Sequence, residues 1–277
     1  MPIIWPGLLQ RAVYAREGPR ATLRRNRENG GNRPMKARAV TGRLVRAGLH
    51  RRPVLAMRFP DFDAETLDIL IRVLPCTMTS PERIAAVIHA VRYIEAAGVA
   101  GDFVECGVYR GGSSMAAALA LKTPRPLRLF DTFEGMTAPT AADTRPGGQT
   151  AASMLEGAGQ SDTILCYSSL DEVRANMAST GYPADQITYV KGRVEDTLPS
   201  GAPDAIAILR LDTDWYESTR HELACLYPRL SPGGVLIIDD YGHWTGAKKA
   251  VDEYFADAPL MLTRIDYTGR VAVKPLR

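Results

Sequence analysis

The sequence predicts an α/β fold built on a mostly parallel sheet with helices on both faces. Short, continuously apolar runs alternate with stretches of helical periodicity from about residue 100 onward, which is typical of parallel strands covered on both sides. The 277 residues, 45% hydrophobic and 23% charged, suffice for one such domain plus an extension. This is the pattern of a Rossmann-like fold.

The first part of the chain is strongly basic. Residues 1–52 hold 13 Lys or Arg against two Asp or Glu, a balance of +11, whereas the remainder balances at −8. The stretch Arg16–Arg38 is rich in Arg, Gly, Asn and Pro and is predicted to be mobile, between short helices around Leu8–Ala15 and Ala39–Ala47. We predict a basic, partly flexible extension over residues 1–60.

The folded domain is predicted over residues 61–277. Asp61 or Asp63 can cap a first helix that runs to Leu74. Ser80-Pro81-Glu82 then signals a second helix, since it places a capping serine before a proline at the first helical position.

Five strands and four further helices are expected to alternate after these two. The strands are Phe103–Val108, Leu127–Phe130, Ile187–Val190, Ala205–Leu211 and Val235–Ile238. The helices are Ser113–Leu121, Leu170–Ser179, Ser218–Leu226 and Gly246–Ala256. Between them, the Ala/Thr/Gly-rich segment from Thr137 to Ser161 is interpreted as a substrate lid, with an insertion of no function as the alternative.

Cysteine usage and hydropathy indicate a cytoplasmic protein. The four cysteines lie far apart and form no CxxC pair, which favours reduced thiols over a zinc site or a disulfide framework. No apolar run reaches the roughly 18 residues of a membrane helix, and the first residues lack the basic region of a secretory signal.

The run from Asp102 to Ser114 predicts a strand, a glycine-rich turn and a helix start. Its spacing is E-x-G-x-x-x-G, from Glu105, rather than the G-x-G-x-x-G of nicotinamide-binding folds. Glycines allow close approach of a ligand, and the N–H groups at a helix start favour a carboxylate. An acid at the strand end suits an ammonium group, such as that of S-adenosylmethionine; a turn without a ligand is the alternative. Asp131, about 26 residues later, is placed like an acid that binds a ribose diol.

Four aspartates follow two apolar strands and are expected to meet at one edge of the sheet: Asp212, Asp214, Asp239 and Asp240. Without compensation such a cluster is unfavourable because of desolvation and mutual repulsion. Oxygen ligands alone indicate a hard cation, Mg²⁺ or else Mn²⁺ or Ca²⁺. Two alternatives stay open: Arg210 can neutralise part of the cluster, and Asp214 can cap the helix near Ser218. His243 either faces a substrate or is a solvated loop residue.

From about Phe62 to Phe255 the sequence resembles the macrocin O-methyltransferase (TylF/MycF-type) family. The matching runs are Thr77–Arg83, Phe103–Ser113, Asp131–Gly135, Val190–Gly192 with Asp196–Pro199, Leu209–Thr219 and Ile238–Gly242. The resemblance implies a class I methyltransferase fold, Mg²⁺ held by Asp212, Asp239 and Asp240, and Asp214 as general base. It also implies an S-adenosylmethionine pocket lined by Met78, Glu105, Cys106, Gly107, Tyr109, Ser113, Asp131, Thr132, Phe133 and Gly192. The basic extension is a departure from the family pattern.

The function implied by the resemblance is methylation of a sugar hydroxyl in a natural product or glycoconjugate. The expected partners are a small acceptor, in particular a glycoside, and further copies of the chain in a homo-oligomer, with no nucleic acid. A catechol-type O-methyltransferase would use the same metal chemistry. An RNA methyltransferase, suggested by the basic extension, and a non-catalytic binding module are the remaining alternatives.

Overall fold

A computed structural model describes residues 52–159 and 163–276 of the chain. All of them belong to the unit Leu44–Arg277. Most of the predicted extension over residues 1–60, including the helices expected at Leu8–Ala15 and Ala39–Ala47, therefore lies outside the described residues. Of its last residues, 52–58 are helical.

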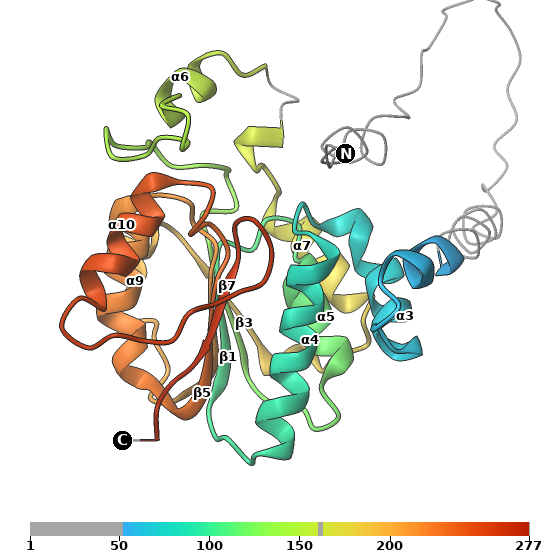
Figure 1. Ribbon diagram of the computed structural model, residues 1–277. Helices are drawn as coiled ribbons and strands as arrows, with labels where there is room; N and C mark the ends of the chain where they lie inside the picture. The colour runs from blue at the N-terminus through green and yellow to red at the C-terminus, as the bar shows by residue number, and fades with distance from the viewer. Residues whose placement is uncertain (1–51, 160–162, 277) are drawn as a thin grey trace, which may run out of the picture. The chain divides into compact units, whose positions relative to one another are not determined.

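The core of the domain is a seven-stranded sheet of order β3-β2-β1-β4-β5-β7-β6 (Figure 1). Five parallel strands form most of it. They are β1 (Asp102–Cys106), β2 (Leu127–Asp131), β3 (Ile187–Lys191), β4 (Ile206–Leu211) and β5 (Leu230–Ile238). The prediction of a mostly parallel sheet is confirmed.

Two further strands at one edge were not predicted. β7 (Arg270–Val273) pairs antiparallel with β5, and β6 (Thr263–Arg264) pairs antiparallel with β7. Two to four residues give too short a pattern to separate a strand from a loop. Their pairing with β5 is what makes them strands, and that pairing is a property of the tertiary structure.

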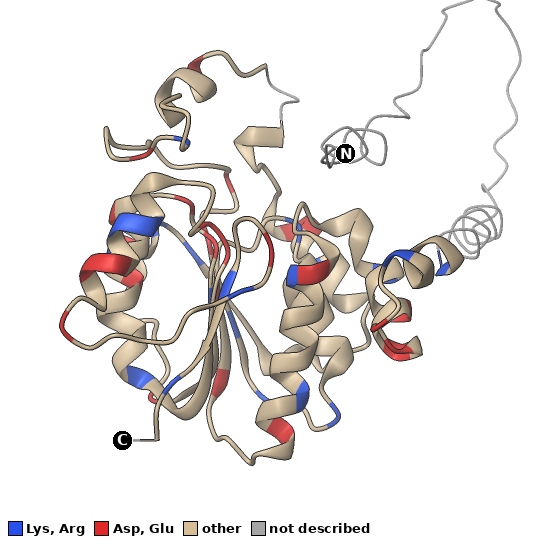
Figure 2. Ribbon diagram, in the orientation of Figure 1, with Lys and Arg blue, Asp and Glu red and all other residues tan. Residues whose placement is uncertain are grey.

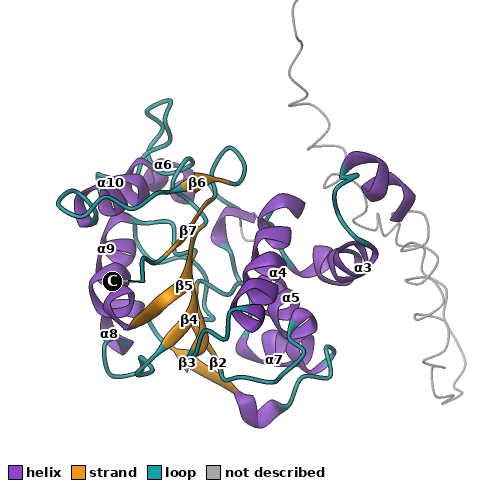
Figure 3. Ribbon diagram, turned by 60° about the horizontal axis from the view of Figure 1, so that its bottom comes forward, coloured by secondary structure: helices purple, strands orange, loops and turns teal. Residues whose placement is uncertain are grey.

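Helices cover both faces of the sheet (Figure 3). On one face lie α3 (Ala64–Val73), α4 (Pro81–Ala96), α5 (Gly112–Ala120) and α7 (Leu170–Ala178); on the other lie α8 (Val194–Thr197), α9 (Tyr216–Leu226) and α10 (Thr245–Tyr254). Single 3₁₀ turns occur at Leu74–Cys76, Thr163–Leu165, Ala184–Gln186 and Tyr227–Arg229. No helix of the described residues is long and apolar enough to cross a membrane.

Hydrogen bonds at the helix starts explain where α3 and α4 begin. The Asp63 carboxylate accepts a hydrogen bond from Thr66 N at 2.7 Å, so Asp63 rather than Asp61 caps α3. Ser80 caps α4 through Arg83 N, with Pro81 at the first helical position. Both caps satisfy backbone N–H groups that would otherwise lack partners.

Alternate residues of the strands enter two separate cores. On β1, Phe103 packs under α3, α4, α5 and α7, whereas Val104 packs under α8, α9 and α10. Because successive side chains of a strand point to opposite faces, a continuously apolar strand fills both cores. On the central strands β1 and β4, the charged side chains Glu105 and Arg210 lie one residue before the carboxyl ends of the strands.

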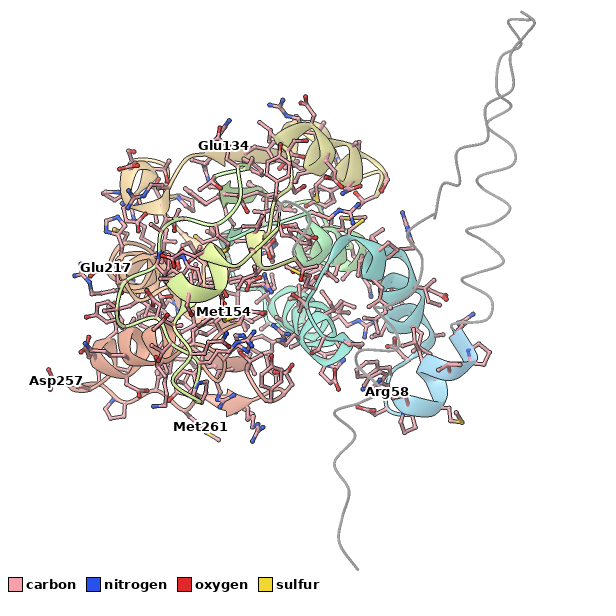
Figure 4. The ribbon with its side chains drawn as sticks, turned by 90° about the horizontal axis from the view of Figure 1, so that it is seen from above. Arg58, Glu134, Met154, Glu217, Asp257 and Met261 are labelled. Atoms are coloured by element: carbon pink, nitrogen blue, oxygen red, sulfur yellow. The ribbon has the colours of Figure 1, made fainter. Side chains whose placement is uncertain are left out.

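The segment between β2 and α7 is partly folded. It contains α6 (Ala151–Glu156), which was not predicted, and an isolated bridge between Thr144 and Thr150. Met154 and Leu155 of α6 pack against a small apolar cluster around Trp215 and Trp244. Seen from above, α6 with Met154 lies over the middle of the domain, whereas Glu217 and Asp257 lie at its periphery (Figure 4).

Candidate functional site

A cavity of about 300 Å³ lies at the carboxyl ends of the parallel strands. The turns after all five strands β1 to β5 contribute to its wall, as do residues 77–79 before α4 and residues 135–137 and 145 of the segment that carries α6. Sites of open α/β sheets form at this edge, and at the point where the strand order reverses. Acidic and basic segments meet at this edge, close to the ends of the central strands (Figure 2).

Backbone contacts fix the glycine-rich turn after β1. Gly107 has a φ of +82°, and a Cβ there would lie 2.0 Å from the carbonyl oxygen of Asp212. Only glycine therefore allows this turn to pack against the turn after β4. Asp131 Oδ2 accepts hydrogen bonds from the N–H groups of Val108 at 2.6 Å and Tyr109 at 2.9 Å. Asp131 thus holds the turn in place while its carboxylate lines the cavity.

Seven of the ten predicted cofactor-binding residues line the cavity: Met78, Gly107, Tyr109, Ser113, Asp131, Thr132 and Gly192. The other three side chains lie elsewhere. Cys106 packs in the core under α9 and α10, and Phe133 packs in the opposite core. Glu105 is fully buried beneath the cavity.

Glu105 is held by an internal ion pair instead of reaching the cavity. It pairs in register with Arg210 of the neighbouring strand β4, so both side chains lie on the same face. Arg210 Nη1 donates to Glu105 Oε1 at 2.6 Å, and the Ser114 hydroxyl donates to the other carboxylate oxygen. Burial raises the pKa of Glu105, and the charge of Arg210 opposes that shift. The structure therefore gives Glu105 a partner other than the ammonium group expected from the sequence.

The three predicted metal ligands converge. One carboxylate oxygen each from Asp212, Asp239 and Asp240 lies within 4.8 Å of the others. Burial, followed by the charges of Asp214 and Asp212, raises the pKa of Asp240 well above its usual value. Asp240 Oδ2 is shielded from solvent and has no hydrogen-bond partner in the part of the chain that the structure describes.

Two arginines compensate part of this charge. Arg210, only 1% exposed, contacts Asp212 Oδ2 at 2.7 Å and Asp239 Oδ1 at 2.5 Å besides Glu105. Arg83 of α4 binds the second oxygen of Asp239 and also Asp266. The alternative that Arg210 neutralises part of the cluster is therefore correct for Asp212 and Asp239. Asp240 has no such ion pair within residues 52–159 and 163–276.

These residues fit a hard divalent cation. A carboxylate oxygen has two lone pairs, so Asp212 and Asp239 can bind a cation while they keep their arginine contacts. The free Oδ2 of Asp240 supplies a ligand atom with no competing bond. Three carboxylates and no histidine or thiol form the donor set that Mg²⁺ prefers.

Asp214 lies beside this cluster on the cavity wall. Its φ of +67° turns the chain sharply after β4, and its Oδ1 accepts a hydrogen bond of 2.7 Å from the indole N–H of Trp244. Burial, with the charge of Asp212, raises the pKa of Asp214 to about 7, against the lowering effect of the Trp244 bond. A carboxylate with a pKa near the working pH can accept a proton from a substrate.

The cap of α9 comes from a residue that sequence reasoning missed. Asp143, fully buried, accepts a hydrogen bond of 2.7 Å from Tyr216 N at the first residue of α9. The alternative that Asp214 caps this helix is therefore wrong, because Asp143 takes that position from a distant part of the chain. α9 also begins at Tyr216, two residues before the predicted start at Ser218. Asp143 accepts the hydrogen bond of the Tyr216 N–H, which would otherwise lack a partner.

Aromatic side chains form the wall on the β5 side of the cavity. The rings of Trp215 and Trp244 meet edge to face with centroids 5.0 Å apart. His243 Nδ1 and the Tyr267 hydroxyl are 3.1 Å apart. His243 is half-buried and lines the cavity, so it faces the site, and burial lowers its pKa to about 4.

Arg83 is a residue of the site that was not predicted, although the sequence contains an indication of its importance. It ends the run Thr77–Arg83 that carries the family resemblance, in which only Met78 was given a role. Asp143, Tyr267 and Asp266 had none, because each reaches the site from a loop whose local sequence predicts no structure.

Comparisons with known proteins show which sequences and solved structures this chain resembles. The sequence profile described as Macrocin-O-methyltransferase (TylF) matches residues 71–273. A protein of Streptomyces olivaceus, named 8-demethyl-8-(2,3-dimethoxy-alpha-L-rhamnosyl)-tetracenomycin-C 4'-O-methyltransferase, is 36% identical over 216 residues, 76% of this chain and 80% of that protein. The Mycinamicin III 3''-O-methyltransferase of Micromonospora griseorubida is 34% identical over 182 residues, 64% of this chain and 69% of that protein.

A solved structure shows the same fold. The structure of the O-methyltransferase NovP superimposes with a TM-score of 0.62 at 32% sequence identity and covers 72% of this chain and 82% of its own. The calicheamicin methyltransferase CalS11, at 18% identity and a TM-score of 0.56 over 90% of this chain and 99% of its own, shares the fold.

Proposed function

Because the chain belongs to the macrocin O-methyltransferase (TylF) family, we propose that it transfers the methyl group of S-adenosylmethionine to a sugar hydroxyl of a natural product or glycoconjugate. The observation that carries this proposal is the convergence of Asp212, Asp239 and Asp240 beside Asp214, in the same cavity as the glycine-rich turn after β1. A methyl donor and a hydroxyl acceptor can then meet in one site.

The cofactor half of the cavity is formed by the turns after β1, β2 and β3. The N–H groups at the start of α5, with Ser113, suit the carboxylate of the cofactor. Oδ1 of Asp131 accepts one backbone hydrogen bond, from Phe133 N at 2.7 Å, so one of its lone pairs is left to accept a bond from a ribose hydroxyl. Gly192 also lines this half of the cavity, and its φ of +141° is one that residues with a side chain rarely adopt.

Asp212, Asp239 and Asp240 would hold a divalent cation, Mg²⁺ in the first place. A bound cation lowers the pKa of a hydroxyl group that it coordinates and fixes its orientation. Asp214, whose carboxylate is oriented by the Trp244 N–H, is placed to accept the hydroxyl proton. The apolar cluster under α6 limits the access of water to that carboxylate.

Two experiments test the proposal. Isothermal titration of the full chain with S-adenosylmethionine, with and without Mg²⁺, measures cofactor binding. A panel of acceptors incubated with methyl-labelled cofactor measures methyl transfer. We expect cofactor binding in both conditions and transfer to glycosides only with the cation. Transfer to catechols instead of glycosides would favour the aromatic alternative. Binding of RNA with a steep salt dependence would favour an RNA methyltransferase, and no cofactor binding at all would leave a non-catalytic module.

A further inference from the structure

Arg145 has a fixed place at the cavity, although it belongs to the segment between β2 and α6. Its N–H donates to the carbonyl of Gln149, and its own carbonyl accepts from Gly148 N, both at 2.8 Å. The hydroxyl groups of the preceding Thr144 and of Thr245 on α10 are 2.7 Å apart. These bonds attach the Arg145 backbone to the start of α10.

Among the residues that the structure describes, the guanidinium group of Arg145 has no acidic partner. Three arginines line the cavity, and two of them, Arg83 and Arg193, form ion pairs with carboxylates. Within the described ranges no carboxylate oxygen lies within 4.0 Å of Arg145. Its Nε is shielded from solvent and has no hydrogen-bond partner there either, and Cζ stands 5.8 Å from the centre of the Trp244 ring.

Arg145 faces the acceptor half of the cavity. It lies against Trp244, which follows β5, whereas the turns proposed for the cofactor follow β1, β2 and β3. In the sheet order β3-β2-β1-β4-β5, these two groups of turns lie on opposite sides of β4. The guanidinium group of Arg145 therefore lies on the far side of the proposed general base Asp214 from the turns proposed for the cofactor.

We propose that the acceptor carries an anionic group, a carboxylate or a phosphate, near the hydroxyl that is methylated, and that Arg145 binds this group. The inference rests on the proposed function, since it concerns the acceptor of that reaction. A guanidinium group matches the oxygens of carboxylate and phosphate in two parallel hydrogen bonds. Elsewhere on this wall an anionic group would be repelled by Asp214 and Asp240. Arg145 therefore favours an acceptor with a negative charge and determines where that charged group lies. Arg145 is thus a specificity-determining residue.

The test measures binding, which does not depend on turnover. Trp215 and Trp244 are two of the three tryptophans of the chain and both line the cavity, so intrinsic fluorescence reports ligands there. Two matched pairs, with S-adenosylhomocysteine and Mg²⁺ present, distinguish the anions: methyl glucuronoside against methyl glucoside, and rhamnose 1-phosphate against methyl rhamnoside. The variants are Arg145→Gln, Arg145→Lys and, as a control on an exposed arginine of α9, Arg220→Gln.

We expect the wild-type protein and Arg220→Gln to bind one anionic sugar roughly tenfold to a hundredfold more tightly than its neutral counterpart. Arg145→Gln should abolish this preference, and Arg145→Lys should restore part of it. No preference in the wild-type protein, or a preference that survives in Arg145→Gln, overturns the inference. If neutral glycosides are methylated and bound as well as anionic ones, the inference fails while the proposed function stands. If S-adenosylmethionine does not bind, the proposed function itself fails.

Discussion

The indole N–H of Trp244 donates a hydrogen bond of 2.7 Å to Oδ1 of Asp214. Trp244 follows β5 and Asp214 follows β4, so this bond joins two neighbouring strand ends. It fixes one carboxylate oxygen and leaves the other free of this bond. The orientation of the proposed base thus depends on a residue 30 positions away in the sequence.

Asp214→Asn should abolish turnover and preserve cofactor binding. The amide keeps the oxygen that accepts the Trp244 bond but cannot take up a proton at neutral pH. We expect kcat to fall roughly a hundredfold to ten-thousandfold, with an unchanged Kd for S-adenosylmethionine by isothermal titration. Asp171→Asn, at an exposed position of α7, is the control. Undiminished turnover in Asp214→Asn would exclude it as the base.

Asp240→Asn should weaken cation binding. The substitution removes the charge of the carboxylate whose Oδ2 has no other partner, and affinity for hard cations depends on the number of charged ligands. Calorimetry with Mg²⁺ should show a Kd raised roughly tenfold or more, again with Asp171→Asn as control. An unaltered affinity would mean that the cation, if bound, lies elsewhere.

Arg210→Met should destabilise the whole domain. The side chain contacts Glu105, Asp212 and Asp239 while almost fully buried. Its removal leaves the fully buried Glu105 without an ion pair and leaves Asp239 with Arg83 alone; breaking such a buried pair costs about 3–5 kcal/mol. Urea unfolding, with Arg220→Met as the exposed control, measures the change. A loss no larger than that of the control would show that the buried carboxylates are protonated or otherwise compensated.

Asp143→Ala should loosen the segment that carries α6. The substitution removes the carboxylate that accepts a hydrogen bond from Tyr216 N at the start of α9, and this bond attaches the segment to that helix. Loss of such a cap costs roughly 0.5–2 kcal/mol. Ser169→Ala removes a comparable cap from α7 and is the matched control. Limited proteolysis should cut residues 144–159 faster in Asp143→Ala alone. Equal cleavage in both variants would mean that Asp143 only caps the helix.

Asp63 should make stability depend on pH in acid. The backbone N–H of Thr66 is the main cause that lowers the pKa of Asp63 from 3.8 to about 2, with Arg92 contributing. A lowered folded-state pKa stabilises the fold above pH 3.8, and this stabilisation is lost as the pH falls from about 3.8 to about 2. Asp63→Asn keeps a capping oxygen without the charge. The difference in unfolding free energy between the two proteins, measured by denaturation, should shrink over that interval; a constant difference would contradict this.

Local patterns were sufficient to predict the five parallel strands and the positions of Asp212, Asp214, Asp239 and Asp240. Each strand is a short, mostly apolar run, and its end is marked by a glycine or an acid in the next residues. Parallel strands bring their carboxyl ends to one edge, so the convergence of these aspartates followed from the order of the elements alone.

The partners of those residues were decided by the tertiary structure. Glu105 was expected in the cavity because it lies at the end of a strand. Its register with Arg210 on β4 instead brings the two side chains together in a buried ion pair below the cavity. Asp143 caps α9 across a gap of 73 residues. Ion pairs and caps formed by distant residues depend on which side chains meet in space. Sequence periodicity indicates only which side chains of a segment lie on which of its faces. It therefore determined at which edge of the sheet the aspartates lie. Which residues they and Glu105 contact was decided by how the chain packs.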